Sequence, residues 1–156
     1  MHIVVVYDSH FGNTERIARA IAERLGRHGD VRVASIQGGP HTAPGALDLL
    51  VVGAPTQGHG VSPAMRRWLD GLRQVAGVHA AAFDTRFAKP RWLTGSAARF
   101  VAGHLGRLGF RLVRDPESFY VAHTHGPLLD GELERAARWA DTLADQHIPE
   151  AAGAGV

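Results

Sequence analysis

The residues most suited to chemistry are Ser9 to Glu15, where an apolar run gives way to polar side chains. Ser9, Asn13 and Thr14 offer side-chain hydrogen-bond donors, and Gly12 lets the backbone bend without a Cβ clash. A helix beginning at Asn13 would turn unpaired backbone N–H groups toward an anion. The segment lacks the Lys-Ser/Thr pair of P-loop nucleotide-binding proteins and the three glycines of a dinucleotide-binding turn. It therefore predicts a site for one terminal phosphate monoester. The alternative is an ordinary strand-to-helix turn with a capping Thr.

Two further segments have side chains suited to binding a flat ligand. In the first, Pro55 to Gly60, the Thr56 hydroxyl and the Gln57 amide can hydrogen-bond the edge of such a ligand. Gly58 and Gly60 permit a close backbone approach, and His59 could lie against the plane of the ligand. The second segment follows a later apolar run and contains Asp84, Thr85, Arg86 and Phe87.

Apolar runs and amphipathic helical patterns alternate along the chain, which indicates an α/β fold. Strands are expected at residues 2–7, 31–36, 47–52 and 78–83, with a fifth in two pieces at 110–113 and 118–122. Helices are expected from Asn13, after the N-cap Ser62, over residues 96–108, and after a cap at Asp130. This alternation predicts a parallel sheet covered on both faces. Ligands of such sheets bind beyond the carboxyl ends of the strands, so we expect the three segments to share one edge.

Length and composition favour one globular domain over residues 1–148, followed by a flexible tail at 149–156. Without cysteine the chain has no thiol chemistry and no thiolate metal site. No metal site is expected, because His123 and His125 have no third ligand at a suitable spacing. The net charge is only +2 and no basic patch is interleaved with aromatic residues, which argues against nucleic-acid binding. We expect a cytoplasmic protein, since no leader and no membrane-spanning stretch is apparent.

Ser9, Gly12, Asn13 and Thr14 also stand where the flavodoxin-like family has its phosphate loop, and Phe11 replaces a hydroxyl residue of that loop. The segment 51–56 is similar to the quinone-reductase and menaquinone-dependent protoporphyrinogen oxidase branches of the family. The resemblance covers nearly the whole chain and implies a doubly wound, five-stranded parallel sheet of order 2-1-3-4-5.

The same resemblance implies FMN as the cofactor. Its phosphate would be bound by residues 9–14, including His10 and Phe11, and its ring by residues 55–60 and 84–87. The aromatic contacts of the family would fall here to His59 and to Phe87 or Trp92. A peptide at Gly58 or Gly60 would turn toward the reduced ring, and Arg86 would place positive charge near it. Because the family's dedicated carriers are acidic and this chain is weakly basic, we expect a less negative potential for its fully reduced flavin.

With FMN bound, the flavin would carry the redox chemistry and no catalytic side chain would be required. One hypothesis is an electron carrier that docks on redox partner proteins, either a flavin reductase or an electron acceptor. A second is an FMN-dependent enzyme that reduces quinones or related small acceptors. A third is a flavodoxin-shaped interaction module that no longer binds flavin. The physiological partner and the oligomeric state remain open at this point.

Overall fold

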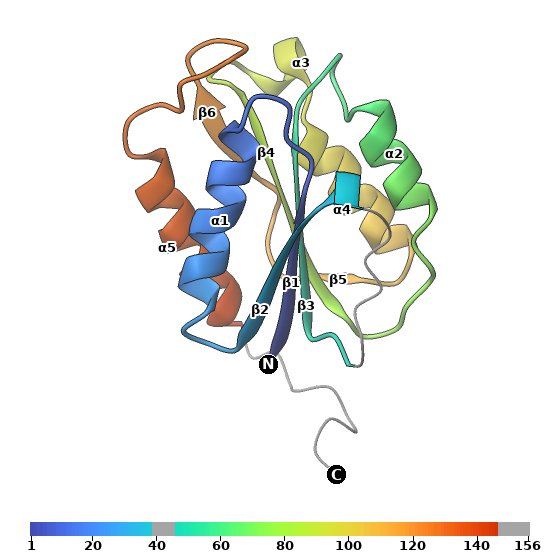
Figure 1. Cartoon of the computed structure of the whole chain (residues 1–156). Helices are drawn as coiled ribbons and strands as arrows, with labels where there is room; N and C mark the ends of the chain where they lie inside the picture. The colour runs from blue at the N-terminus through green and yellow to red at the C-terminus, as the bar shows by residue number, and fades with distance from the viewer. Residues whose placement is uncertain (39–45, 147–156) are drawn as a thin grey trace.

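A parallel β-sheet with helices on both faces forms the centre of the protein in a computed structural model, which describes residues 1–38 and 46–146 (Figure 1). Residues 39–45 and the whole predicted tail at 149–156 lie outside the described residues. The sheet order is β2-β1-β3-β4-β5. The first two residues of β4, His79 and Ala80, pair with β5, and its later residues, Phe83 to Phe87, pair with β6. The order implied by the family resemblance is therefore confirmed. The strands are β1 (His2–Tyr7), β2 (Asp30–Ser35), β3 (Leu49–Pro55), β4 (His79–Phe87), β5 (Arg111–Leu112) and β6 (Glu117–Val121).

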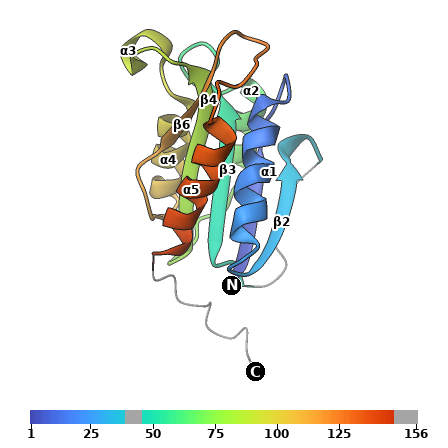
Figure 2. The ribbon, with the colours of Figure 1, turned by 90° about the vertical axis from the view of Figure 1, so that its left-hand side faces the viewer.

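Two helices cover each face of the sheet. The helices α1 (Asn13–Leu25) and α5 (Glu132–Ala144) pack on one face, while α2 (Pro63–Asp70) and α4 (Ala97–Arg107) pack on the other (Figures 1 and 2). Two short helices, η1 (Ile36–Gly38) and α3 (Arg91–Thr94), lie outside these layers. In the described part of the chain, no helix has the length and apolar character needed to cross a membrane.

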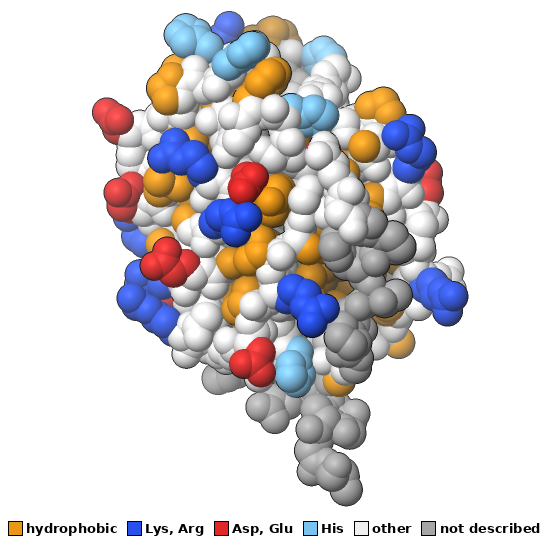
Figure 3. All heavy atoms as spheres, in the orientation of Figure 1, with side chains coloured by type: hydrophobic (Ala, Val, Ile, Leu, Met, Phe, Trp, Pro, Cys, Tyr) orange, Lys and Arg blue, Asp and Glu red, His pale blue; other side chains and the backbone are white. Residues whose placement is uncertain are grey.

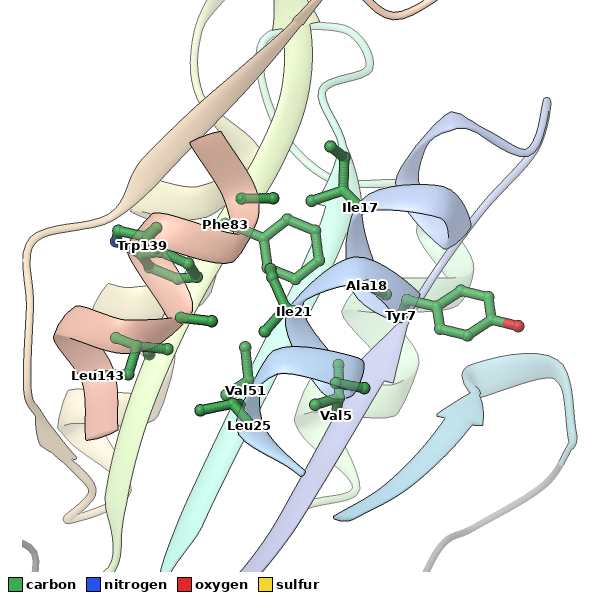
Figure 4. Packing of buried hydrophobic residues seen from close by; sticks show 14 of the residues in the cluster. Val5, Tyr7, Ile17, Ala18, Ile21, Leu25, Val51, Phe83, Trp139 and Leu143 are labelled. Atoms are coloured by element: carbon green, nitrogen blue, oxygen red, sulfur yellow. The ribbon is translucent and has the colours of Figure 1, made fainter. Parts of the chain in front are cut away.

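The alternation of side chains along the strands builds a separate core on each face. In β1, Val5 and Tyr7 point to the layer of α1 and α5, whereas Val4 and Val6 point to the layer of α2 and α4. Both sets are buried, which explains why the strand is apolar without interruption. On the first face, Phe83 packs at the centre of the core and makes edge-on contacts with Phe119 and Trp139 (Figure 4).

Two strands are longer than the sequence predicted, and this changes the two later binding segments. The strand β3 continues to Pro55, and β4 continues to Phe87, so residues 84–87 are strand and not loop. The reason is long-range pairing, because β3 pairs with β4 as far as Thr85, and β6 pairs with β4 from Phe83 to Phe87. The predicted cap of the last helix was also wrong by one position, since Gly131 occupies it in a left-handed conformation.

Candidate functional site

The loop after β1 carries backbone N–H groups that have no protein partner. Gly12 is the N-cap of α1 with a φ of 90°, and it makes no side-chain capping bond to the helix. The Ser9 hydroxyl accepts hydrogen bonds from the N–H groups of Gly12, at 3.2 Å, and of Glu15, at 3.3 Å. The N–H groups of Asn13 and Thr14 have no acceptor among residues 1–38 and 46–146. Unpaired N–H groups at a helix N-terminus are suited to binding an anion.

A cavity of about 700 Å³ opens beside this loop at the carboxyl edge of the sheet. It brings together twelve of the sixteen predicted site residues: His10, Phe11, Asn13, Thr14, Pro55, Thr56, Gln57, Gly58, His59, Thr85, Arg86 and Phe87. These residues come from the ends of β1, β3 and β4, as the sheet topology requires. Among the residues that the structure describes, no carboxylate lines the cavity.

The remaining four predicted residues, Ser9, Gly12, Gly60 and Asp84, do not line the cavity. Ser9 and Gly12 shape the first loop from behind through the contacts described above. Gly60 is paired with Gln57, and Asp84 is completely buried on the opposite side of β4.

A tight turn forms the second cavity segment. Backbone hydrogen bonds join Gln57 and Gly60 in both directions, at 2.8 and 2.9 Å. Between them, Gly58 has a φ of 52° and His59 a φ of 69°. Positive φ values at both central residues are those of a type I′ turn, in which His59 occupies a conformation disfavoured for most side chains. The turn is tightly packed, since a Cβ on Gly95 would lie 2.2 Å from the His59 carbonyl oxygen.

Asp84 has a structural position, because side chains alternate between the two faces of β4. Thr85 points to the α1 side, where its hydroxyl lies 2.8 Å from the buried hydroxyl of Thr14. Asp84 points to the other face, and its Oδ2 accepts hydrogen bonds from the Ser96 hydroxyl at 2.6 Å and from Ala98 N–H at 3.0 Å. Its carboxylate therefore anchors the first turn of α4 and faces away from the cavity.

Arg86 is buried at the end of β4, with 7% of its surface exposed, and it holds several neighbouring segments together. Its Nε donates to the Ser118 hydroxyl of β6 at 2.9 Å. Its Nη1 donates to the carbonyl of Lys89 at 2.6 Å and to the hydroxyl of Thr94 at 3.2 Å. The guanidinium also lies over the ring of Tyr120, 5.3 Å from its centre. Arg86 thus both lines the cavity and fixes the segment that carries α3.

The cavity also contains residues that were not predicted: Lys89, Leu93, Thr94, Val121 and Thr124. Val121 pairs with Phe87 at the end of β6, so Thr124 follows a strand that ends at the same edge. The expected fifth strand could have indicated Thr124 by the same topological rule that indicated the other segments. Leu93 and Thr94 lie on α3, for which the sequence has no helical pattern.

One contact in the first loop joins residues far apart in sequence. Phe11 stacks on His125, with ring centres 4.1 Å apart and ring planes 15° from parallel. Asn13 lies close to Gly126, where an added Cβ would be 2.8 Å from its side-chain oxygen. The segment after β6 therefore closes over one side of the first loop.

Solved structures share this fold at low sequence identity. The chain matches oxidised flavodoxin 2 from Bacillus cereus with a TM-score of 0.77 and 22% identity, over 92% of this chain and 98% of that one. A flavodoxin from the domain Archaea matches with a TM-score of 0.69 and 22% identity, over 92% and 96% of the two chains. A flavodoxin, WrbA-like protein from Agrobacterium tumefaciens matches with a TM-score of 0.67 and 20% identity, over 92% and 94%.

No match to the chain was found among curated proteins. The family model for flavodoxin matches residues 5–139, which includes the first loop and every strand and helix that lines the cavity. The chain therefore belongs to the flavodoxin family.

Proposed function

We propose that this chain binds FMN in the cavity at the carboxyl edge of the sheet and transfers electrons to partner proteins. The observation that carries the proposal is the pair of free N–H groups, Asn13 and Thr14, at the N-terminus of α1. They open beside a cavity whose volume of about 700 Å³ is within the usual range for cofactor sites. The lack of carboxylates in the lining favours an anionic ligand.

The residues of the first loop fit a phosphate group. Its oxygens would accept hydrogen bonds from the two free N–H groups, while the Ser9 hydroxyl supports the loop from behind. A Cβ at Gly12 would meet no atom within 4 Å, so the loop has open space on that side. Each charge-assisted hydrogen bond contributes about 1.5–3 kcal/mol, so the phosphate would supply much of the affinity for FMN.

The ring would lie between the turn at residues 57–60 and the end of β4. We expect His59 and Phe87, which both line the cavity, to contact its faces. Each such contact contributes about 0.5–1.5 kcal/mol beyond the burial of area. Trp92 does not line the cavity, so of the two aromatic residues considered for the second face, Phe87 is better placed.

Bound FMN would supply the redox chemistry, and the side chains would bind and orient it. The Thr56 hydroxyl accepts a hydrogen bond from Ala97 N–H, which leaves its own hydrogen free for the ring edge. Ser118, Lys89 and Thr94 fix the guanidinium of Arg86, which would place a positive charge beside the site. The buried carboxylate of Asp84, 3.9 Å from Nε of Arg86, offsets part of that charge. A fixed cation favours a ligand that gains negative charge on reduction.

A comparison of two flavins tests the proposal. The protein freed of ligand is titrated with FMN and with riboflavin, and the quenching of flavin fluorescence is measured. We expect FMN to bind at least about tenfold more tightly, because one charge-assisted hydrogen bond alone corresponds to that factor. Equal affinity for the two flavins would contradict a phosphate site at the first loop. The absence of any binding would favour an interaction module without flavin.

Quinone reduction is a second candidate, because a further cavity of about 490 Å³ adjoins the first. The two share Phe87, Lys89, Val121 and Thr124, so a small acceptor would have room next to the ring. The FMN-loaded protein is mixed with NADH or NADPH and menadione, and absorbance at 340 nm is followed. Consumption of the nicotinamide cofactor in turnovers that depend on menadione would favour the enzyme over the carrier.

A further inference from the structure

The exposed apolar side chains of this protein gather around the mouth of the cavity. All five large hydrophobic residues that are exposed in the described chain, Phe11, Phe87, Trp92, Leu93 and Leu129, lie in segments at the carboxyl edge of the sheet. Trp92 on α3 is the most exposed of them, at 79%. Tryptophan and phenylalanine are enriched at the centres of protein interfaces, and exposed groups of them mark interaction sites.

The same edge is basic. From residue 85 to residue 114 the sequence has seven Lys or Arg and no Asp or Glu, although the whole chain has a net charge of only +2. Arg86, Lys89, Arg91 and Arg99 belong to the part of this stretch at the carboxyl edge. No carboxylate of the described residues lines either of the two cavities there. In Figure 3 the upper edge shows histidine and basic side chains beside hydrophobic patches, and the acidic side chains of that face lie lower.

Three cations at this edge, of which Lys89 and Arg99 are exposed and Arg91 is half-buried, are also unpaired. Lys89, Arg91 and Arg99 form no ion pair with any residue in the described ranges 1–38 and 46–146. Elsewhere on the surface, Arg24 pairs with Asp141 at 2.7 Å and Arg19 with Glu15 at 2.9 Å. The unpaired cations therefore keep their full charge available for an external carboxylate.

The surface is held in place by buried contacts. Arg86 fixes the carbonyl of Lys89, just before α3, and the hydroxyl of Thr94, the last residue of α3, and Gly95 packs tightly against His59. A surface that is already ordered loses little conformational entropy when a partner docks.

We propose that Phe87, Lys89, Arg91, Trp92 and Leu93, hereafter the basic–apolar patch, dock a redox protein whose own docking face is acidic. This inference rests on the proposed function in that the partner exchanges electrons with FMN. The patch adjoins the cavity through Phe87, Lys89 and Leu93, so a docked partner would cover its mouth. A protein is favoured over an anionic membrane because the patch has only two cations around an aromatic centre, the exposed Lys89 and the half-buried Arg91, and membrane attraction needs several more.

Nuclear magnetic resonance with probe proteins tests the patch without requiring flavin. The 15N-labelled protein is titrated with cytochrome b5, whose haem edge is surrounded by carboxylates, and with cytochrome c, whose haem edge is surrounded by lysines. We expect the indole N–H signal of Trp92 to move with cytochrome b5, while those of Trp68 and Trp139 stay in place. Raising the ionic strength from about 20 mM to about 300 mM should weaken binding at least about tenfold.

Three variants locate the interaction. Lys89→Glu should raise the Kd for cytochrome b5 at low salt at least about threefold, and Trp92→Ala about fivefold or more. Arg107→Glu is the matched control, because it makes the same charge change on an exposed residue at the far end of α4. It should raise the Kd clearly less than Lys89→Glu does, since Arg107 lies outside the patch, at the end of α4 away from the carboxyl edge.

Several results would overturn the proposal. These are tighter binding of cytochrome c than of cytochrome b5, equal effects of Lys89→Glu and Arg107→Glu on the Kd, or a Trp92 signal that does not move with cytochrome b5. A Trp92 shift with phosphatidylserine vesicles or duplex DNA but not with cytochrome b5 would assign the patch to those partners instead. Docking of cytochrome b5 by a protein that takes up no FMN would support the patch and contradict the proposed function, so the two failures are distinguishable.

Discussion

Two glycines in this protein allow a matched test of the phosphate loop. Gly12, the N-cap of α1, has φ 90° and ψ −9°, and Gly131, the N-cap of α5, has φ 83° and ψ −3°. A Cβ added at either position would meet no atom within 4 Å, so alanine there introduces no clash. Replacing either glycine with alanine should therefore have the same effect on the backbone, but only Gly12 belongs to the loop beside the cavity.

The stability cost follows from the backbone alone. A left-handed conformation costs an alanine about 1–2 kcal/mol relative to glycine, and the smaller entropy of its unfolded state returns about 0.4–1 kcal/mol. We expect Gly12→Ala and Gly131→Ala each to lower the free energy of unfolding by about 1 kcal/mol. Urea unfolding of the ligand-free variants and of the unmodified protein measures this change in the free energy of unfolding.

The two substitutions should differ in their effect on flavin. Relaxation of Gly12 toward negative φ would turn the N–H groups of Asn13 and Thr14 away from the phosphate. The loss of one such hydrogen bond corresponds to at least about a tenfold weaker Kd for FMN. Riboflavin lacks the phosphate, so its Kd should change by less than about twofold, and Gly131→Ala should leave both affinities unchanged. Equal losses for FMN and riboflavin, or unchanged FMN binding, would refute this account of the loop.

Three further predictions concern the turn and the core. His59→Gly removes a ring from the cavity and relieves a positive φ of 69°, so FMN affinity should fall about two- to tenfold while the ligand-free protein is not destabilised; FMN titration and urea unfolding measure the two effects. Gly53→Ala should cost about 3 kcal/mol in urea unfolding, because the new Cβ would lie 2.0 Å from Cζ of Phe83, whose ring is held by Phe119 and Trp139. For Glu132, burial raises the pKa, but the hydrogen bonds from Arg135 and from Tyr120 N–H outweigh burial and lower it overall. A lowered pKa stabilises the fold above the unfolded value of about 4.3 and ceases to do so as pH falls through the folded value. Glu132→Gln should therefore cost about 1–2 kcal/mol at pH 7, and its difference from the unmodified protein should shrink below about pH 4; a difference independent of pH would contradict this.

Where local residue pattern decides the structure, the sequence was sufficient. The first strand is apolar on both faces, and its expected bounds, residues 2–7, are those observed. The helix expected from Asn13 begins there, and Ser62 caps α2 by accepting a hydrogen bond from Met65 N–H. The order of strands came from the family resemblance, because periodicity alone does not determine which strands are neighbours.

Where distant segments decide the structure, the sequence was insufficient. The run Asp84-Thr85-Arg86 has the composition of a loop, yet it is strand because β3 and β6 pair with β4 on its two sides. Once it is strand, the alternation of faces puts Thr85 at the cavity and Asp84 behind it. The stacking of Phe11 on His125 likewise joins segments more than a hundred residues apart, and no local pattern indicates it.

The frame of the site is held by two buried carboxylates with the same arrangement. Asp8, just after β1, accepts a hydrogen bond from the hydroxyl of Ser62 at 2.6 Å, and Asp84 in β4 accepts one from Ser96 at the same distance. Each serine is the N-cap of a helix on that face, so the positive end of a helix dipole lies beside each carboxylate.

Both aspartates are fully buried, and in the described chain each has one carboxylate oxygen without a hydrogen bond, although Oδ1 of Asp84 lies 3.9 Å from Nε of Arg86. Removing either carboxylate would leave its capping serine without this acceptor. Each carboxylate therefore joins a strand end to a helix start. Residues 88–95 connect the two elements that Asp84 joins, β4 and α4, and residues 56–61 lead from β3 to α2, the helix that Asp8 holds. Side chains in those segments can change to suit a ligand or a partner without disturbing the frame. It follows that the four buried polar residues Asp8, Ser62, Asp84 and Ser96 help to determine where the cavity lies, while the residues that line the cavity determine what it binds.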